Sequence, residues 1–355
     1  MAHRDIVVIG GSAGSLESLQ NIITGFPRDL AASILVVIHM SADFPSLLAH
    51  QFTRWGKLPA TPAVDKEPLK KGHIYVARPD HHLTLEGHRI RVQRGPRENR
   101  HRPAVDALFR TAAREYGPRV VGVVLSGLRD DGSAGLYAVK QRGGVAIVQD
   151  PRDAPWDEMP RNALEYASPH YVLRTEDIAP TLTQLLTADN GESVMTRKHT
   201  IEKYSGNKAP SRNNGSKKAS EPDENLQTAY NDEGEGMPSV FACPECHGVL
   251  WEIKDKKVVR FRCRVGHSYG TESLARELSH ASEAALWAAM RALEEKAAMQ
   301  LRLADRLSGN KMSARRLHDQ SKADESNARL IRDMIFERDA ELETESEIHE
   351  AKKTA

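Results

Sequence analysis

The chain has 355 residues, with 50 lysines and arginines against 49 aspartates and glutamates, and only 3 cysteines. A net charge of +1 argues against a dedicated nucleic-acid-binding protein, and three cysteines are too few for a disulfide scaffold. No apolar stretch approaches the ~20 residues of a membrane span, and no secretion signal opens the chain, so the sequence predicts a cytoplasmic protein of about two or three domains without membrane insertion.

Short apolar runs alternate with helix-like stretches over residues 1–187. Runs of four to six apolar residues without alternation are typical of parallel strands that are buried on both faces. Helices between such strands predict an α/β fold, a doubly wound, mostly parallel sheet with helices on both faces. The alternating segments 82–86 and 89–92 instead predict an antiparallel hairpin. The predicted parallel strands are 6–9, 33–38, 74–77, 120–125, 145–148 and 171–173.

The composition changes near residue 188. Ser, Asn, Gly, Lys and Glu dominate residues 188–239, where too little apolar surface is available to offset the entropy of ordering, so we predict a flexible linker. A cysteine-containing module follows at 240–275. Apolar residues spaced three and four apart then predict packed helices, a helical hairpin or coiled-coil segment over 276–340 that could pair two copies of the chain, and a charged, frayed tail over 341–355.

A glycine-rich turn follows the first predicted strand. Gly10-Gly11-Ser12-Ala13-Gly14 satisfies G-x-S-x-G, a pattern that places a nucleophilic serine on a sharp strand-to-helix turn. The amides at the start of the helix can then bind a developing oxyanion. The same turn could instead cradle a phosphate or only pack a helix, whereas the G-x-G-x-x-G fingerprint of dinucleotide-binding proteins is absent.

Two further strand ends carry the groups that would activate this serine. His39 follows the strand 33–38, and Asp130 and Asp131 follow the strand 120–125. Side chains at the carboxyl ends of parallel strands converge, and a serine nucleophile needs a base that is oriented by an acid. Taken alone, His39 could be a polar residue at a helix start, and either aspartate could be a helix N-cap. The coincidence of three strand ends favours catalysis.

Five spaced segments resemble, in the same order, the catalytic domain of the chemotaxis protein-glutamate methylesterase (CheB) family. The resemblance covers about residues 4–186 and implies that Ser12 is the nucleophile, His39 the base and Asp131 the acid of a triad that needs no cofactor. It also implies hydrolysis of glutamate methyl esters on the cytoplasmic helices of methylated chemoreceptors, with deamidation of glutamines in many family members. The five segments are 6–14, 37–40, 102–109, 125–136 and 149–161.

The reaction implied is acyl transfer through Ser12. The backbone N–H of Ala13 is the expected oxyanion donor, with a contribution from the region of Leu128. This chain has Ala-Gly-Ser after the serine where the family usually has Thr-Gly-Gly, and Leu-Ser-Gly-Leu-Arg at 125–129 where the family has Leu-Thr-Gly-Met-Gly. These departures bear on substrate preference and rate more than on reaction type.

The family resemblance leaves regulation and an alternative function open. Most chemotaxis methylesterases carry an amino-terminal receiver domain, but the resemblance begins near residue 5, so we expect regulation from elsewhere in the chain, from a partner, or not at all. The alternative is a catalytically degenerate signalling or scaffold module that acts through the cysteine-containing module and the carboxy-terminal helices. A nucleotide-binding protein is a third, weaker hypothesis.

All three cysteines lie in a C-x2-C … C-x3-H arrangement within 240–275. Two closely spaced pairs can supply four ligands to one tetrahedral ion, and a Cys3His set is typical of structural zinc. The flanking segments 249–253 and 258–262 read as strands, so we predict a zinc-ribbon-like module that depends on the metal because it is too short for its own core. The predicted ligands are Cys243, Cys246, Cys263 and His267.

Other interpretations of this module are weaker. Ordinary reduced thiols would not explain the clustering, a redox C-x-x-C would need a surrounding βαβ unit, and His247 would duplicate the position of its neighbour Cys246. Six lysines and arginines make the module locally basic, but a solvated face explains them more simply than nucleic-acid binding. Similar segments accompany some methylesterases that lack a receiver domain. The histidines at 50, 73, 81, 82, 88 and 101 show no metal spacing and are assigned no role.

Overall fold

The computed structural model describes residues 3–42, 45–187, 236–255, 258–306 and 311–354. The chain divides into two units, residues 1–274 and 275–355. Residues 188–235 of the predicted linker lie outside the described residues.

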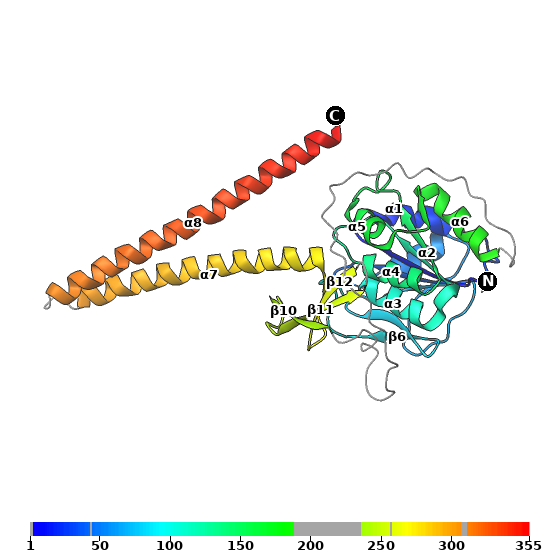
Figure 1. Cartoon of the computed structure of the whole chain (residues 1–355), viewed down its shortest axis with the longest axis horizontal. Coiled ribbons are helices and arrows are strands. Elements are labelled where there is room, and N and C mark those ends of the chain that lie inside the picture. The colour runs from blue at the N-terminus through cyan, green and yellow to red at the C-terminus, as the bar shows by residue number, and fades with distance from the viewer. Residues whose placement is uncertain (1–2, 43–44, 188–235, 256–257, 307–310, 355) are drawn as a thin grey trace, which may run out of the picture. The chain divides into compact units, whose positions relative to one another are not determined.

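A seven-stranded sheet forms the centre of the first unit, and every pair of neighbouring strands in it is parallel (Figure 1). All positions of the central strands are buried, as their uninterrupted apolar sequences predict. In spatial order the strands are β3 (Ala60–Pro62), β4 (His73–Val76), β2 (Ser33–Ile38), β1 (Ile6–Gly11), β7 (Val120–Val124), β8 (Val145–Gln149) and β9 (Tyr171–Leu173).

Helices cover both faces of this sheet, which confirms the predicted doubly wound fold. Successive residues of β1 point to opposite faces, so Val8 packs in one hydrophobic core and Val7 in the other. The first core is shared by α3 (Val105–Tyr116), α4 (Ser133–Gln141) and α5 (Glu158–Ala167), and the second by α1 (Ser15–Gly25), α2 (Leu48–Trp55) and α6 (Thr175–Thr187). A 3-10 turn, η1 (Gly117–Arg119), links α3 to β7.

The strand order places a topological switch point at β1. The chain proceeds from β1 to β2 on one side and later returns to β7 on the other side. Ligands of open α/β sheets bind at the carboxyl ends of strands around such a point. Gly10 lets α3 approach this end of the sheet, because a Cβ on Gly10 would lie 2.1 Å from Cγ1 of Val105.

Two smaller sheets complete the first unit. The predicted hairpin is present as β5 (His82–Glu86) and β6 (Arg89–Gln93), paired antiparallel. The cysteine-containing module is a four-stranded antiparallel sheet in which the two predicted strands are joined by two that the sequence pattern did not indicate. In spatial order its strands are β10 (Met237–Ala242), β11 (Val249–Asp255), β12 (Val258–Cys263) and β13 (Ser268–Gly270).

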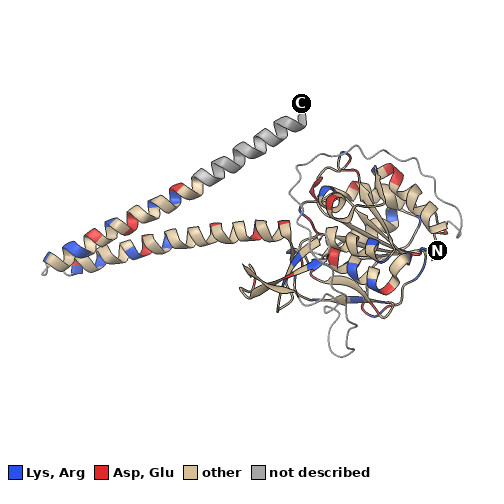
Figure 2. Cartoon of the chain, in the orientation of Figure 1, with Lys and Arg blue, Asp and Glu red and all other residues tan. Residues whose placement is uncertain are grey.

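Two long helices, α7 (Thr271–Arg306) and α8 (Lys311–Thr354), form an antiparallel pair. Trp287 packs edge-on against Phe336, and the Nζ of Lys296 donates to Asp324 at 3.1 Å. The helix α7 begins before the predicted apolar stripe, and α8 includes the residues of the predicted tail. Charges of both signs are interspersed along the described parts of the two helices (Figure 2). None of the helices described is both long enough and apolar enough to span a bilayer.

Candidate active site

Ser12 and His39 leave the sheet side by side. The last paired residues of β1 and β2 are Gly11 and Ile38, so Ser12 and His39 are the first residues beyond the sheet on neighbouring parallel strands. The His39 N–H donates to the Gly11 carbonyl at 3.2 Å, and the Ser12 N–H donates to the Ser126 carbonyl, after β7, at 2.9 Å. The backbone of the predicted nucleophile is therefore fixed between the ends of β2 and β7.

The predicted base and acid are hydrogen-bonded to each other. Nε2 of His39 lies 2.7 Å from Oδ2 of Asp131, and the two side chains are only 6% and 1% exposed. A carboxylate at Nε2 favours the tautomer with its proton on Nε2, which leaves a lone pair on Nδ1. Within the described chain, Nδ1 is buried and has no hydrogen-bond partner, and Ser12 Oγ makes no hydrogen bond to the ring. Such bonds commonly form or tighten only when substrate binds.

Four donors converge on the Asp131 carboxylate. Oδ2 accepts from His39 and from the Val105 N–H at 2.7 Å, and Oδ1 accepts from Asn99 Nδ2 at 2.9 Å and from the Asp106 N–H at 3.1 Å. The two backbone donors belong to the first turn of α3, a helix terminus that favours negative charge. Burial alone would raise the pKa of Asp131, but the hydrogen bond and charge of His39 hold it well below its usual value.

The structure distinguishes the two candidate acids. Asp131 does not cap the following helix, since the N-cap of α4 is Gly132 and no side chain caps it. Asp130 is buried and accepts a hydrogen bond from the Ser273 hydroxyl, whereas the hydrogen bond of His39 goes to Asp131. Burial raises the pKa of Asp130 to about 6. Asp131 is therefore the group placed to orient the imidazole.

Sequence reasoning gave no role to Asn99 and Asp106, which lie beside His39 and Asp131. Asn99 bridges Asp131 and Asp106 through its amide group. Asp106 accepts from the Gly132 N–H at 3.0 Å, and burial together with the charge of Asp131 raises its pKa to about 7. Asn99 and Asp106 lie on a loop and a helix, not at a strand end. Asn99 has a left-handed backbone, with φ of 49°, a conformation that asparagine tolerates but that its sequence context does not indicate.

His101, which the sequence left without a role, stacks on the predicted base. Its ring lies 3.5 Å from the ring of His39, centroid to centroid, with 6° between the planes. Burial, and then the neighbouring His39, lower the pKa of His101 to about 3. The His101 ring is therefore neutral at physiological pH, and it fixes the plane of His39 without adding a competing charge.

The predicted oxyanion donors lie on two loops that are bonded to each other. The Ser126 hydroxyl donates to the carbonyl of Ala13 at 2.8 Å. Among the described residues no acceptor is found for the backbone N–H of Ala13 or of Leu128, whereas the N–H of Gly127 donates to Trp156 at 2.9 Å and that of Arg129 to Glu158 at 2.8 Å. Both predicted donors are thus available to a ligand.

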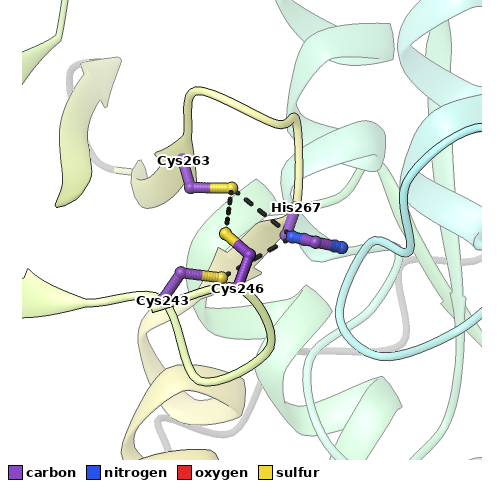
Figure 3. A group of neighbouring side chains, drawn as sticks. All are labelled: Cys243, Cys246, Cys263 and His267. Carbon is purple, nitrogen blue, oxygen red and sulfur yellow. Dashed lines mark hydrogen bonds between the residues drawn. The ribbon is translucent and has the colours of Figure 1, made fainter. Parts of the chain in front are cut away.

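A second site lies in the cysteine-containing module, where the four predicted ligands meet (Figure 3). One ligand atom from each residue falls within 4.8 Å of all the others, so the cluster could hold a metal ion. Cys246 Sγ lies 3.5 Å from Cys263 Sγ, and His267 Nδ1 lies 3.7 Å and 3.5 Å from the sulfurs of Cys243 and Cys263. Tetrahedral coordination with the usual Zn–S and Zn–N bond lengths requires separations of about 3.6–3.8 Å. His247 is not in the cluster.

Local hydrogen bonds shape both halves of this cluster. The His247 N–H donates to the Cys243 carbonyl at 2.8 Å, and the Gly266 N–H donates to the Cys263 carbonyl at 2.9 Å, so each ligand pair lies on a tight turn. Nε2 of His267 is 3.2 Å from a carboxylate oxygen of Glu245. A carboxylate on the second ring nitrogen is the usual outer partner of a metal-bound histidine, and it leaves Nδ1 free to bind.

Known proteins resemble the parallel-sheet part of the chain in sequence and in fold. Residues 7–182 match the CheB methylesterase family. A Leptospira interrogans protein, provisionally named a protein-glutamate methylesterase/protein-glutamine glutaminase, is 36% identical over 51% of this chain and 94% of its own length. A protein of that name from Moorella thermoacetica is 38% identical over 52% of this chain but only 44% of its own length. The crystal structure of the Thermotoga maritima CheB methylesterase catalytic domain matches with a TM-score of 0.50 and 33% identity, over 52% of this chain and all of that one.

Proposed function

Because the chain belongs to the CheB methylesterase family, we propose that it hydrolyses the γ-methyl esters of glutamate side chains in chemoreceptors. The buried hydrogen bond between His39 and Asp131, at the strand end next to Ser12, is the observation that carries this proposal. A base held by an ionised acid, beside a serine on a strand-to-helix turn, is the arrangement that acyl transfer requires.

In the proposed reaction, Ser12 Oγ attacks the γ-carbonyl carbon of the ester while its proton passes to Nδ1 of His39. Collapse of the tetrahedral intermediate expels the methoxy group, which takes that proton and leaves as methanol. A water molecule, deprotonated by His39, then attacks the glutamyl ester of Ser12; the bond to Oγ breaks, His39 returns the proton to Oγ, and the glutamic acid product is released and ionises in solution. Asp131 holds the Nε2 proton throughout and stabilises the imidazolium that forms in each half-reaction.

The N–H groups of Ala13 and Leu128 are proposed to bind the oxyanion of each tetrahedral intermediate. Ala13 directly precedes Gly14, the N-cap of α1, where the helix terminus also favours negative charge. Removing one such donor usually lowers the rate on the order of 10²–10³-fold. The same acyl-enzyme would form from a glutamine side chain with loss of ammonia, so we also propose the deamidation that the names of the relatives describe.

Methanol release from a methylated chemoreceptor tests the esterase proposal directly. We expect release by the wild-type chain and none by Ser12→Ala or His39→Ala. A fluorophosphonate probe should label the wild type at Ser12 and should not label the Ser12→Ala variant. If neither turnover nor labelling occurs in the wild type, the alternative of a catalytically degenerate signalling or scaffold module would replace the esterase.

We propose that the Cys3His cluster holds structural zinc. Three thiolates and an imidazole match the soft donor set that zinc prefers, and four protein ligands leave no open position for catalysis. Metal analysis should find roughly one zinc per chain, and Cys243→Ala or Cys263→Ala should lose it. The expected loss reflects the removal of one of four ligands from a small module that cannot build a core of its own. Absence of zinc from protein that was purified without chelator would contradict the assignment.

The remaining proposals concern organisation and partners. The sequence divides the chain into a catalytic domain (1–187), a linker (188–239), a zinc-ribbon-like module (240–275), a helical segment (276–340) and a charged tail (341–355). We keep this division but move two boundaries, because the strand β10 of the module begins at Met237 and the helix α7 begins at Thr271. The substrate would be the helical cytoplasmic part of a receptor, which places the protein in the cytoplasm, with no role for nucleic acid. The pair α7–α8 is a proposed contact between two copies, which the mass of the protein in solution would test.

A further inference from the structure

The cysteine-containing module pairs with a loop next to the active site. Its last strand, β13, directly follows the ligand His267. The Asn99 N–H donates to the Ser268 carbonyl at 2.7 Å, and the Ser268 N–H donates to the Arg97 carbonyl at 3.3 Å. This short parallel pairing joins β13 to residues 97–99 of the catalytic part. The metal ligand His267 is therefore bonded directly to Ser268, and Ser268 is joined to the loop 97–99 by a pair of hydrogen bonds.

The side chain of Asn99 extends this connection to the triad. Its Oδ1 accepts from the Gly270 N–H at 2.8 Å, while its Nδ2 donates to Asp131 at 2.9 Å and to Asp106 at 3.1 Å. The amide can adopt only this orientation, because its oxygen faces a donor and its nitrogen faces two carboxylates. Asn99 is 3% exposed, so every group that it contacts depends on it rather than on water.

A second contact brings the same segment against the residue before the triad acid. The Ser273 hydroxyl donates to Asp130, and a Cβ on Gly270 would lie 2.0 Å from Oδ2 of Asp130. A side chain at 270 would therefore force either β13 or the Asp130 carboxylate to move. Residues 270–273 therefore contact Asp130 directly and Asp131 through Asn99.

We propose that Asn99 is a positioning residue for the triad acid and that β13 holds it in place only when the Cys3His site is loaded. The inference rests on the proposed esterase function and deepens it, since it makes zinc binding a determinant of the esterase rate. The three-residue strand β13 is held on its other side by β12, and the residue before it, the ligand His267, accepts from the N–H of the ligand Cys263 at 3.0 Å. Loss of the metal would release the turn that carries these two ligands, because short metal modules are ordered by their metal.

Release of β13 would leave Oδ1 of Asn99 without its donor. The side chain could then leave Asp131, which would lose one of four donors and part of the constraint on the His39 ring. A small misplacement in catalytic geometry can lower a rate by up to about 100-fold. We therefore expect Asn99→Ala, and separately zinc removal from the full chain, to lower kcat for methyl ester hydrolysis between about 10-fold and 100-fold with KM nearly unchanged.

The decisive comparison applies both changes to the full chain. Because both act through one contact, zinc removal from Asn99→Ala should lower kcat less than about twofold further, and zinc added back should rescue the wild type but not the variant. The fluorophosphonate labelling rate of Ser12 should follow kcat in all four samples. Glu272→Ala is the control, since Glu272 lies on the same segment and contacts Asn162 but no triad residue; its kcat should stay within about twofold of the wild type.

Gly270→Ala provides a test that leaves Asn99 and all metal ligands intact. It should keep roughly one zinc per chain and still lower kcat to the level of Asn99→Ala. The inference is overturned if zinc-free wild type keeps full kcat, if the effects of zinc removal and Asn99→Ala multiply, or if Gly270→Ala retains wild-type kcat. A wild-type, zinc-loaded chain without turnover or labelling would instead overturn the esterase proposal itself.

Discussion

Replacing Asp131 by asparagine tests the geometry of the triad most sharply, because all four of its contacts are donors. One carboxylate oxygen accepts from His39 and Val105, both at 2.7 Å, and the other accepts from Asn99 and the Asp106 N–H. An asparagine has one carbonyl oxygen and one NH2 group. Whichever way the amide turns, its hydrogens face two donors.

The size of the effect follows from this count. Each buried donor without an acceptor costs roughly 1–3 kcal/mol, so Asp131→Asn should lower the free energy of unfolding by about 2–6 kcal/mol. The neutral amide also removes the charge that stabilises the imidazolium. When its NH2 faces His39, the ring must carry its proton on Nδ1 and cannot accept one from Ser12. We expect kcat to fall on the order of 10⁴-fold, as for loss of the correct tautomer in serine triads.

Methanol release and urea unfolding, measured on the same preparation, check both parts of this prediction. Asp5→Asn is the matched control, because Asp5 is also a buried aspartate but pairs with Arg119, through two contacts at 2.8 Å. It should lower stability and leave kcat unchanged. An Asp131→Asn chain with kcat within tenfold of the wild type, or with unchanged stability, would refute the proposed role of the four donors.

Three further predictions concern neighbouring residues. His101→Phe should keep kcat within a few-fold, because a flat neutral ring still stacks on His39, whereas His101→Ala should lower it about tenfold. Gly10→Ala should lower the free energy of unfolding by about 1–3 kcal/mol through overpacking, and Val105→Ala should restore part of it in the double variant, as urea unfolding would show. Asp130 has a pKa raised to about 6 in the folded chain, so its contribution to stability is present at low pH and is lost between about pH 4 and pH 6. Asparagine does not titrate, so Asp130→Asn lacks this loss. The free energy of unfolding of the variant minus that of the wild type should therefore be about 2–3 kcal/mol larger at pH 7 than at pH 4.

Much of the fold could be predicted because strands buried on both faces have a distinctive sequence. The run 33–38 contains almost only apolar residues and is β2 without any change of bounds. Two of the strands that escaped prediction have no such signal. Ala60–Pro62 is three residues long and ends in proline, and Ser268–Gly270 is short and partly polar. Both are strands because a neighbouring strand supplies hydrogen bonds, which is a tertiary effect.

The candidate active site also has a part that the sequence predicts and a part that it does not. Ser12, His39 and Asp131 could be expected to meet, since the carboxyl ends of neighbouring parallel strands lie at one edge of a sheet. The positions of the strand ends left both adjacent aspartates open, and only the family resemblance favoured Asp131, because the choice depends on which carboxylate faces the first turn of α3. Asn99 and His101 come from an irregular loop whose position depends on the folded environment, so no periodicity or spacing indicated them.

The cysteine-containing module is not an independent body in energetic terms, although its composition makes it look separate. Val258 of β12 is 6% exposed and belongs to the hydrophobic core of the parallel sheet. A short module with few apolar residues cannot fold on burial alone, so it combines metal ligands with a share in a larger core. The contacts of β13 with Asn99 belong to this shared boundary. The match of residues 7–182 to the family therefore covers the proposed nucleophile, base and acid, but the groups that hold the proposed acid extend to Gly270.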